Sequence, residues 1–113
     1  MAKTVTSIYA RKFKMVIFSR GAAIAPGKTA SAIAFAHEIS AYLKTSVGVE
    51  LEVLMPIGGN PNRIGWSTRY KDLAELEATT AKMTADPKYW ELVNKGAENF
   101  MAGSVRDAMW RTV

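Results

Sequence analysis

The sequence predicts a small α+β domain in which four strands and two helices follow one another in the order βαββαβ. Four segments have the alternation or the β-branched and aromatic composition of strands, and two have apolar residues at helical spacing. The chain has 113 residues, of which 49% are apolar. This length and composition suffice for one hydrophobic core, so we expect a single domain spanning residues 1–113.

The first strand is predicted at Ser7–Phe18, which is rich in β-branched and aromatic residues. Strand alternation places Tyr9, Arg11 and Ile17 on one face. Residues 19–27 follow with two glycines and a proline, so we expect a loop there.

A first helix is predicted at Lys28–Thr45, where five alanines accompany apolar residues at helical spacing. Either Thr29 or Ser31 is suited to cap its beginning. Gly48 stands where a helix commonly ends in the left-handed conformation.

Two strands and the turn between them form a predicted hairpin. The second strand is expected at Val49–Ile57 and the third at Arg63–Tyr70, because both segments alternate between two faces. Residues 58–62 between them are Gly-Gly-Asn-Pro-Asn, which is typical of a turn. The face of the third strand that we expect to look towards the helices carries Ile64, Trp66, Thr68 and Tyr70.

A second helix is predicted after Asp72, which is suited to cap it. Proline is tolerated in the first turn of a helix but not in its interior. We therefore expect the helix to break near Pro87, with Asp86 capping its second piece. The last strand is predicted at Val105–Val113.

This element order predicts a ferredoxin-like fold, a four-stranded antiparallel sheet with both helices on one face. The opposite face of the sheet would then have no cover. Because every strand has large apolar residues on both sides, a monomer would expose a sizeable apolar patch. We therefore expect a homodimer that forms through the sheet faces.

Two passages of the sequence, Ile64–Ala78 and Thr84–Phe100, resemble the dimeric α/β-barrel superfamily. This group includes antibiotic-biosynthesis monooxygenase-like, EthD-like, stress-responsive barrel and NIPSNAP-like proteins. The shared features are an aromatic residue that ends the third strand, an Asp-Leu helix start and an Ala-Asp-Pro break before an aromatic residue. Members include cofactor-free oxygenases, haem-degrading enzymes, lactone isomerases and proteins of no known activity, so the resemblance implies a fold more than a chemistry.

The composition excludes several classes of protein. The chain has no cysteine, which rules out disulfides, thiolate metal sites and thiol catalysis, and its single histidine rules out a multi-histidine metal site. No apolar run approaches the roughly 18 residues of a membrane span, and the first residues lack the apolar stretch of a signal peptide. We expect a cytoplasmic protein with no membrane partner.

The formal net charge of +5 is the feature that could indicate a charged partner. The positive side chains are dispersed along the chain, and no nucleic-acid-binding motif accompanies them. We therefore do not expect nucleic acid as a partner. Affinity for a small anionic or carbonyl-bearing ligand is at least as good an interpretation.

No cofactor is expected. The haem-degrading proteins that the chain resembles carry an iron-binding histidine on the second helix, where this chain has none. Gly27, Lys28 and Thr29 imitate a phosphate-binding loop, but five residues separate Gly21 from Gly27 where the motif has four. Pro26 also removes one of the N–H donors that such a loop needs.

Trp66 and Tyr70 are the candidate ligand-binding aromatic residues. In the oxygenase-like relatives that the chain resembles, aromatic residues line a pocket between the sheet and the helices. An indole N–H or a phenol hydroxyl there could bind a substrate oxygen. Large aromatic residues on a buried sheet face are also explained as core, and the sequence leaves both interpretations open.

His37, Arg11 and Arg111 are the remaining candidates. His37 is either a general base or an ordinary residue of the helix surface. Arginine is rarely buried unless it is paired, so Arg11 and Arg111 either form ion pairs or bind an anionic ligand. An arginine such as Arg11 could also stabilise an enolate or phenolate during catalysis. The acidic residues considered as their partners are Glu50, Glu52 and Asp107.

Two functions fit these residues. The first is a small dimeric α/β-barrel protein that binds a metabolite in a pocket between sheet and helices. The alternative is a cofactor-independent monooxygenase or isomerase that acts on an aromatic or polyketide-like substrate. No nucleophile, base and orienting group stand together in the sequence, so the first hypothesis needs fewer assumptions.

Overall fold

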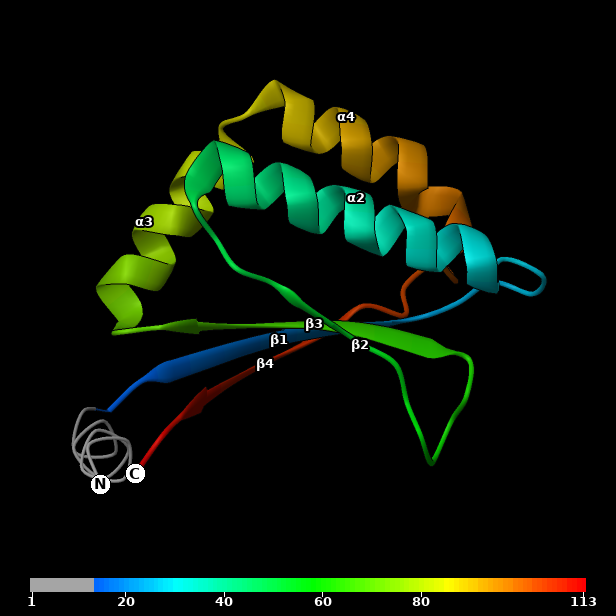
Figure 1. Ribbon diagram of the computed structural model, residues 1–113, viewed down its shortest axis with the longest axis horizontal. Helices are drawn as coiled ribbons and strands as arrows, with labels where there is room; N and C mark the ends of the chain where they lie inside the picture. Colours follow the sequence, from blue (N-terminus) through cyan, green and yellow to red (C-terminus); the bar gives the residue numbers. More distant parts are fainter. Residues whose placement is uncertain (1–13) are drawn as a thin grey trace, which may run out of the picture.

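The computed structural model of the protein describes residues 14–113. Four strands and three α-helices, with a short 3₁₀ turn at Ala97–Asn99, make up this part of the chain (Figure 1). In chain order they are β1 (Val16–Ala23), α2 (Thr29–Val47), β2 (Glu52–Leu54), β3 (Arg63–Tyr70), α3 (Leu73–Thr84), α4 (Pro87–Gly96) and β4 (Arg106–Arg111).

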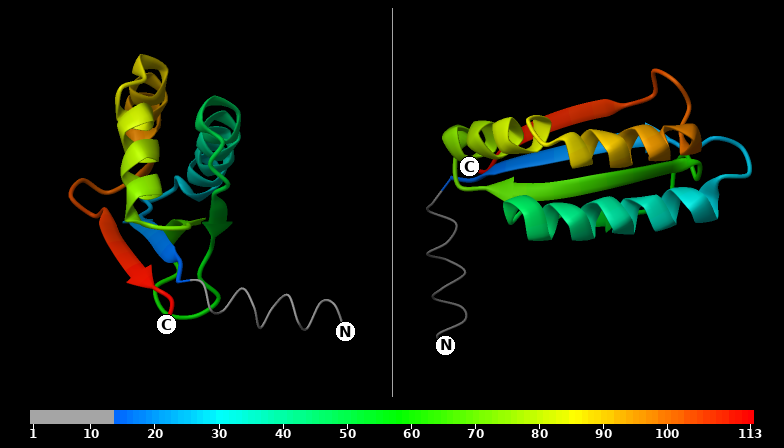
Figure 2. Two further views of the ribbon diagram at one scale, coloured as in Figure 1. Left: turned by 90° about the vertical axis from the view of Figure 1, so that its left-hand side faces the viewer. Right: turned by 90° about the horizontal axis from the view of Figure 1, so that it is seen from above.

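The strands form one antiparallel sheet in the order β2-β3-β1-β4. All three helices lie on the same side of this sheet, with α2 and α4 running beside each other above it (Figures 1 and 2). No helix of the described chain covers the opposite side, which we call the open face. The predicted α+β arrangement, a four-stranded antiparallel sheet with its helices on one face, is confirmed.

The strand register assigns each side chain to one of the two faces. Val16 pairs with Tyr70 and Arg20 with Trp66, so these four residues share the helix-covered face. The alternate positions belong to the open face. They are Ile17, Ser19 and Gly21 on β1, Gly65, Ser67 and Arg69 on β3, Glu52 and Leu54 on β2, and Arg106, Ala108 and Trp110 on β4.

The core lies between α2 and the sheet. Ala32 and Ala36 of α2 are fully buried, and their small side chains let the helix lie close to Ile24 and Ile64. Farther along the same helix, Ile39 and Leu43 pack against Tyr89 and Leu92 of α4. Trp66 touches both clusters and joins them into one core.

An aromatic cluster occupies the centre of this core. The rings of Phe35, Trp66 and Phe100 meet edge to face, with centroids 5.7 to 6.5 Å apart. Phe35 also rests on Gly96, the last residue of α4, where a Cβ atom would overlap its ring. The absence of a side chain at Gly96 therefore lets α4 approach α2.

The first strand differs from its prediction. Residues 7–13 of the predicted segment lie outside the described chain, and β1 continues to Ala23, so the predicted loop is wrong for residues 19–23. Residues 19–23 adopt the strand conformation because β1 is a central strand that forms hydrogen bonds to β3 on one side and to β4 on the other. Hydrogen bonding from two neighbours outweighs the low strand preference of Gly21.

Helix boundaries agree with the sequence at most ends. Gly48 ends α2 in the left-handed conformation with φ 73°, and the Asp72 carboxylate accepts a hydrogen bond from the Glu75 N–H at 2.9 Å. At the junction of α3 and α4, Asp86 accepts one from the Lys88 N–H at 3.0 Å. The predicted cap of α2 is wrong, because Lys28 stands at the cap position and provides no side-chain hydrogen bond.

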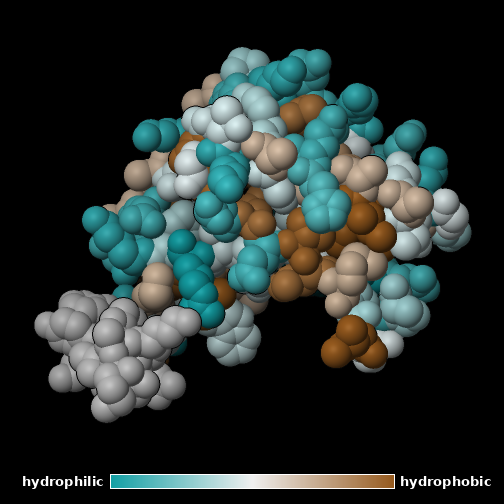
Figure 3. All heavy atoms as spheres, in the orientation of Figure 1, coloured by the Kyte–Doolittle hydropathy of each residue, from teal (hydrophilic) through white to brown (hydrophobic). Residues whose placement is uncertain are grey.

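The second strand is shorter than predicted and the third agrees with its prediction. β2 contains only Glu52–Leu54, whereas β3 spans Arg63–Tyr70. The hairpin loop between them extends to the side of the sheet away from the helices (Figures 1 and 2). Ile57 in this loop is fully exposed, and Figure 3 shows hydrophobic atoms at the loop as well as a larger group between α2 and β2.

Candidate functional site

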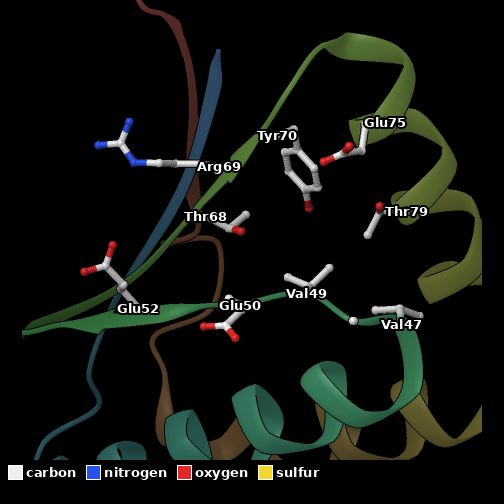
Figure 4. A pocket seen from close by; sticks show the side chains of 10 residues that line it. Val47, Val49, Glu50, Glu52, Thr68, Arg69, Tyr70, Glu75 and Thr79 are labelled. Carbon is white, nitrogen blue, oxygen red and sulfur yellow. The ribbon is translucent and has the colours of Figure 1, made fainter. Parts of the chain in front are cut away.

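An open cleft of about 650 Å³ lies where the end of β3 meets α3, next to the segment that joins α2 to β2 (Figure 4). This volume is within the range of small-molecule sites. The residues that line it are Val47, Gly48, Val49, Glu50, Glu52, Thr68, Arg69, Tyr70, Glu75 and Thr79.

Two hydroxyl groups of β3 face into this cleft. The Tyr70 and Thr68 side chains lie on the helix-covered face of the strand, and both point their oxygens into the space below α3 (Figure 4). Their residues are 8% and 6% exposed, respectively. Neither hydroxyl has a hydrogen-bond partner within residues 14–113.

The opposite wall of the cleft comes from α3. Asp72 caps this helix and fixes its first turn, so Glu75 and Thr79, one turn apart, face the same side. Figure 4 shows the Glu75 carboxylate beside the Tyr70 ring. Burial, and secondarily the charge of Glu75, raises the pKa of Tyr70. The tyrosine therefore presents a neutral hydroxyl at physiological pH.

The charged residues at the β2 side of the cleft are largely compensated or directed away. Glu50 forms an exposed ion pair with Lys44 at 3.5 Å. Glu52 and Arg69 both belong to the open face of the sheet. Figure 4 shows Arg69 extending to the side of the strand opposite Tyr70. The inner cleft is therefore formed by hydroxyls, one carboxylate and the apolar side chains of Val47 and Val49.

The two aromatic candidates are separated by the structure. Both lie on the helix-covered face of β3, but four residues of a strand span about 13 Å. Tyr70 reaches the cleft at the end of the strand, whereas Trp66 is under α2 in the aromatic cluster. The Trp66 Nε1 is buried, has no hydrogen-bond partner within the described residues and is not part of the cleft.

The other candidates lie away from the cleft. His37 is exposed on α2, and Arg11 lies outside the described residues. Arg111 is exposed on β4 and forms no ion pair within residues 14–113. Arg111 is level with Tyr70 on the far side of β1, about 10 Å away, and it does not line the cleft.

The arginine that pairs with Asp107 is Arg20. The guanidinium contacts both carboxylate oxygens, with Nε to Oδ1 at 2.7 Å and a second nitrogen to Oδ2 at 2.9 Å. Arg20 lies within the segment predicted as a loop, so its position on a strand beside β4 was not foreseen. Hydrogen bonding from Arg20 lowers the pKa of Asp107, although burial opposes the shift.

This pair predicts a pH dependence of stability. Because the pKa of Asp107 is lower in the folded state, its ionised form stabilises the fold at pH values above the unfolded-state pKa of about 3.9. This stabilisation is lost as the pH falls through the pKa of the folded state. Because the side chains are 40% and 43% exposed, we expect Asp107→Asn to cost only about 0.5 to 1 kcal/mol at pH 7. Urea unfolding at pH 7 and pH 2.5 should show that difference shrinking in acid. An equal difference at both pH values would contradict this role of the pair.

Metal and membrane sites are not found in the described chain. Within residues 14–113, no group of three histidine, cysteine, aspartate or glutamate side chains is placed to hold a metal ion. No helix in the same range combines the length and apolar character needed to span a bilayer.

The fold is ferredoxin-like and is shared with solved NIPSNAP family proteins and antibiotic-biosynthesis monooxygenase-like proteins, as the sequence resemblance predicted. A NIPSNAP family protein from Agrobacterium tumefaciens has a TM-score of 0.72 at 13% identity, covering 85% of this chain and 83% of that one. An uncharacterised NIPSNAP domain protein from Burkholderia xenovorans has a TM-score of 0.72 at 14% identity, covering 84% and 91%. SnoaB, a cofactor-independent oxygenase from Streptomyces nogalater, has a TM-score of 0.62 at 10% identity, covering 85% and 90%.

These similarities are similarities of fold. The identities are too low to transfer a function, because one fold supports many chemistries. No protein-family model and no curated protein matches the sequence.

Of the ligand-binding residues that the sequence predicts, only Tyr70 lines the cleft, and most of the other lining residues were not predicted. Thr68 shares a strand face with Tyr70, and this alternation was the signal that could have found it. Glu75 and Thr79 show a weaker signal, the one-turn spacing after a helix cap. No local sequence pattern indicates that β2 and the segment before it line the cleft, because this depends on which strand borders β3.

Proposed function

We propose that this protein binds a small metabolite in the cleft between β3 and α3. The observation that carries the proposal is the pair of unpartnered hydroxyls of Thr68 and Tyr70 on buried side chains that face an open space. The two oxygens are open to the cleft, since the buried polar atoms without a partner in residues 14–113 are Trp66 Nε1 and Asn99 Oδ1, so water or a ligand can bond to them. A ligand that reaches these oxygens would provide a hydrogen-bond partner, while Val47 and Val49 would contact its apolar part.

The same proposal includes a homodimer that forms through the open faces of two sheets. The centre of this face carries the small residues Ser19, Gly21, Gly65 and Ser67, which allow a second sheet to approach closely. Exposed apolar side chains, Leu54 on β2 and Trp110 on β4, flank the centre. A face of this kind is favoured as an interface because it removes apolar area from water. The expected cytoplasmic location stays a prediction.

A cofactor-independent oxygenase or isomerase is the second candidate. The likeness of fold to an oxygenase and the Tyr70 hydroxyl in the cleft favour it. General-base catalysis requires a base within hydrogen-bond reach of the substrate, and the candidate base His37 is on the exposed surface of α2. The carboxylate of Glu75 in the inner cleft would have to serve as the base instead. Ligand binding needs no base and therefore explains the cleft with fewer assumptions.

Filling the cleft tests the binding proposal. We expect two-dimensional NMR with a library of small aromatic and apolar compounds to shift the amide signals of residues 68–70 and 75–79. Thr79→Trp places an indole in the cleft and should weaken binding at least about tenfold, because the ligand and the ring compete for one space.

Thr80→Trp is the matched control. Thr80 is exposed on the same helix and does not line the cleft, so this variant carries the same added ring outside the site and should bind like the wild type. Shifts that persist unchanged in Thr79→Trp, or a library with no compound that shifts these signals, would overturn the proposal.

A further inference from the structure

The inner cleft contains one charged group without a counter-charge. Glu75 lies beside Tyr70 (Figure 4) and forms no ion pair within residues 14–113. Glu50 at the mouth is already paired with Lys44, and Arg69 extends to the other side of the strand. The charge that a ligand meets deep in the cleft is therefore negative.

The hydrogen-bonding capacity of the inner cleft points in the same direction. A carboxylate such as Glu75 only accepts hydrogen bonds, whereas the hydroxyls of Thr68 and Tyr70 accept as well as donate. Both hydroxyls lack a partner in the described chain, and their residues are more than nine-tenths buried. A ligand group with several donors would satisfy all three side chains at once.

A protonated primary amine has this chemistry, because it brings three donors and a positive charge. A carboxylate or phosphate would instead face repulsion from Glu75. Deepening the proposed function, on which this inference rests, we propose that the cleft binds a small protonated amine with an apolar or aromatic body. The ammonium group faces Glu75, Tyr70 and Thr68, and the body lies against Val47 and Val49.

This preference is opposite to the one that the net charge of +5 suggests. Exposed charges farther away than about 8 Å are largely screened at physiological ionic strength. The charge next to the ligand therefore decides the selectivity, and the dispersed lysines and arginines contribute little to it.

Three probes with the same ring and different charge test the inference: 2-phenylethylamine, 2-phenylethanol and phenylacetate. Each is titrated to about 10 mM into the full chain and followed by NMR, because ligands of this size bind weakly. We expect the amine to bind about fivefold more tightly than the alcohol, with phenylacetate the weakest of the three. Raising NaCl from about 50 mM to about 500 mM should reduce the preference for the amine but leave the alcohol unchanged.

Glu75→Gln isolates the charge, because it keeps the size of the side chain. In this variant the ratio of amine to alcohol affinity should fall to about one while the alcohol binds as before. Glu77→Gln, an exposed position on the same helix, should retain the wild-type ratio. Equal affinities of amine and alcohol in the wild type would overturn the amine inference and leave the binding proposal standing. Cleft signals that respond to none of the three probes, nor to the wider library, would overturn both.

Discussion

Replacing Gly96 by alanine is expected to lower the free energy of unfolding by about 2 to 3 kcal/mol. Gly96 is the last residue of α4, and a Cβ atom there would overlap the ring of Phe35. The ring of Phe35 contacts Trp66 and Phe100 on its other side, so turning away from Gly96 would break those contacts. The overlap must therefore push α4 away from α2 or disturb the aromatic cluster.

The sign of this effect distinguishes it from an ordinary helix substitution. Alanine is favoured over glycine in a helix by about 1 kcal/mol, so without the contact the variant would be more stable than the wild type. Gly58→Ala is the matched control, because nothing lies within 4 Å of its Cβ position, and it should change stability by less than about 0.5 kcal/mol.

Chemical denaturation of Gly96→Ala, of Phe35→Leu and of the variant that carries both substitutions measures the contact between the two residues. Gly58→Ala is denatured in the same way as the control. The smaller leucine should recover part of the loss caused by Gly96→Ala, which appears as a coupling energy between the two positions. An increase in stability on Gly96→Ala would show that the helices do not approach at this glycine.

Replacing Trp110 by arginine is expected to convert the proposed dimer into a monomer. Trp110 is 65% exposed on the open face of β4, beside Ile17 of β1. Aromatic residues that become buried in an interface commonly contribute about 2 kcal/mol or more to binding, and a symmetric dimer contains this residue twice. An arginine at this position would also bring a charge into the apolar part of the interface. We expect the dissociation constant to rise at least about 100-fold.

Met109→Arg provides a control on the same strand. Met109 is 60% exposed but lies on the helix-covered side of β4, so the same charge introduced there should leave the dimer intact. Sedimentation of the wild type at micromolar concentration should give a species of twice the 12.4 kDa chain mass. A wild type that sediments only at 12.4 kDa would overturn the dimer, and equal effects of the two variants would overturn the assignment of its face.

The sequence by itself determined the strands, the helices and their order, because these depend on local patterns. The alternation over Arg63–Tyr70 marked β3 and its buried face. Asp72, Asp86 and Gly48 marked helix ends, since each acts on backbone groups within a few residues of its own position. The resemblance of two passages then predicted the ferredoxin-like fold that solved NIPSNAP family proteins share.

Only the tertiary structure decided what depends on contacts between distant segments. Arg20 and Asp107 are 87 positions apart and meet because β1 borders β4. Residues 19–23 become a strand because neighbours on both sides bond to them. The cleft likewise exists because α3 begins directly after the end of β3, opposite the segment that joins α2 to β2. This brings Glu75 to Tyr70 while Trp66, on the same strand face, stays in the core.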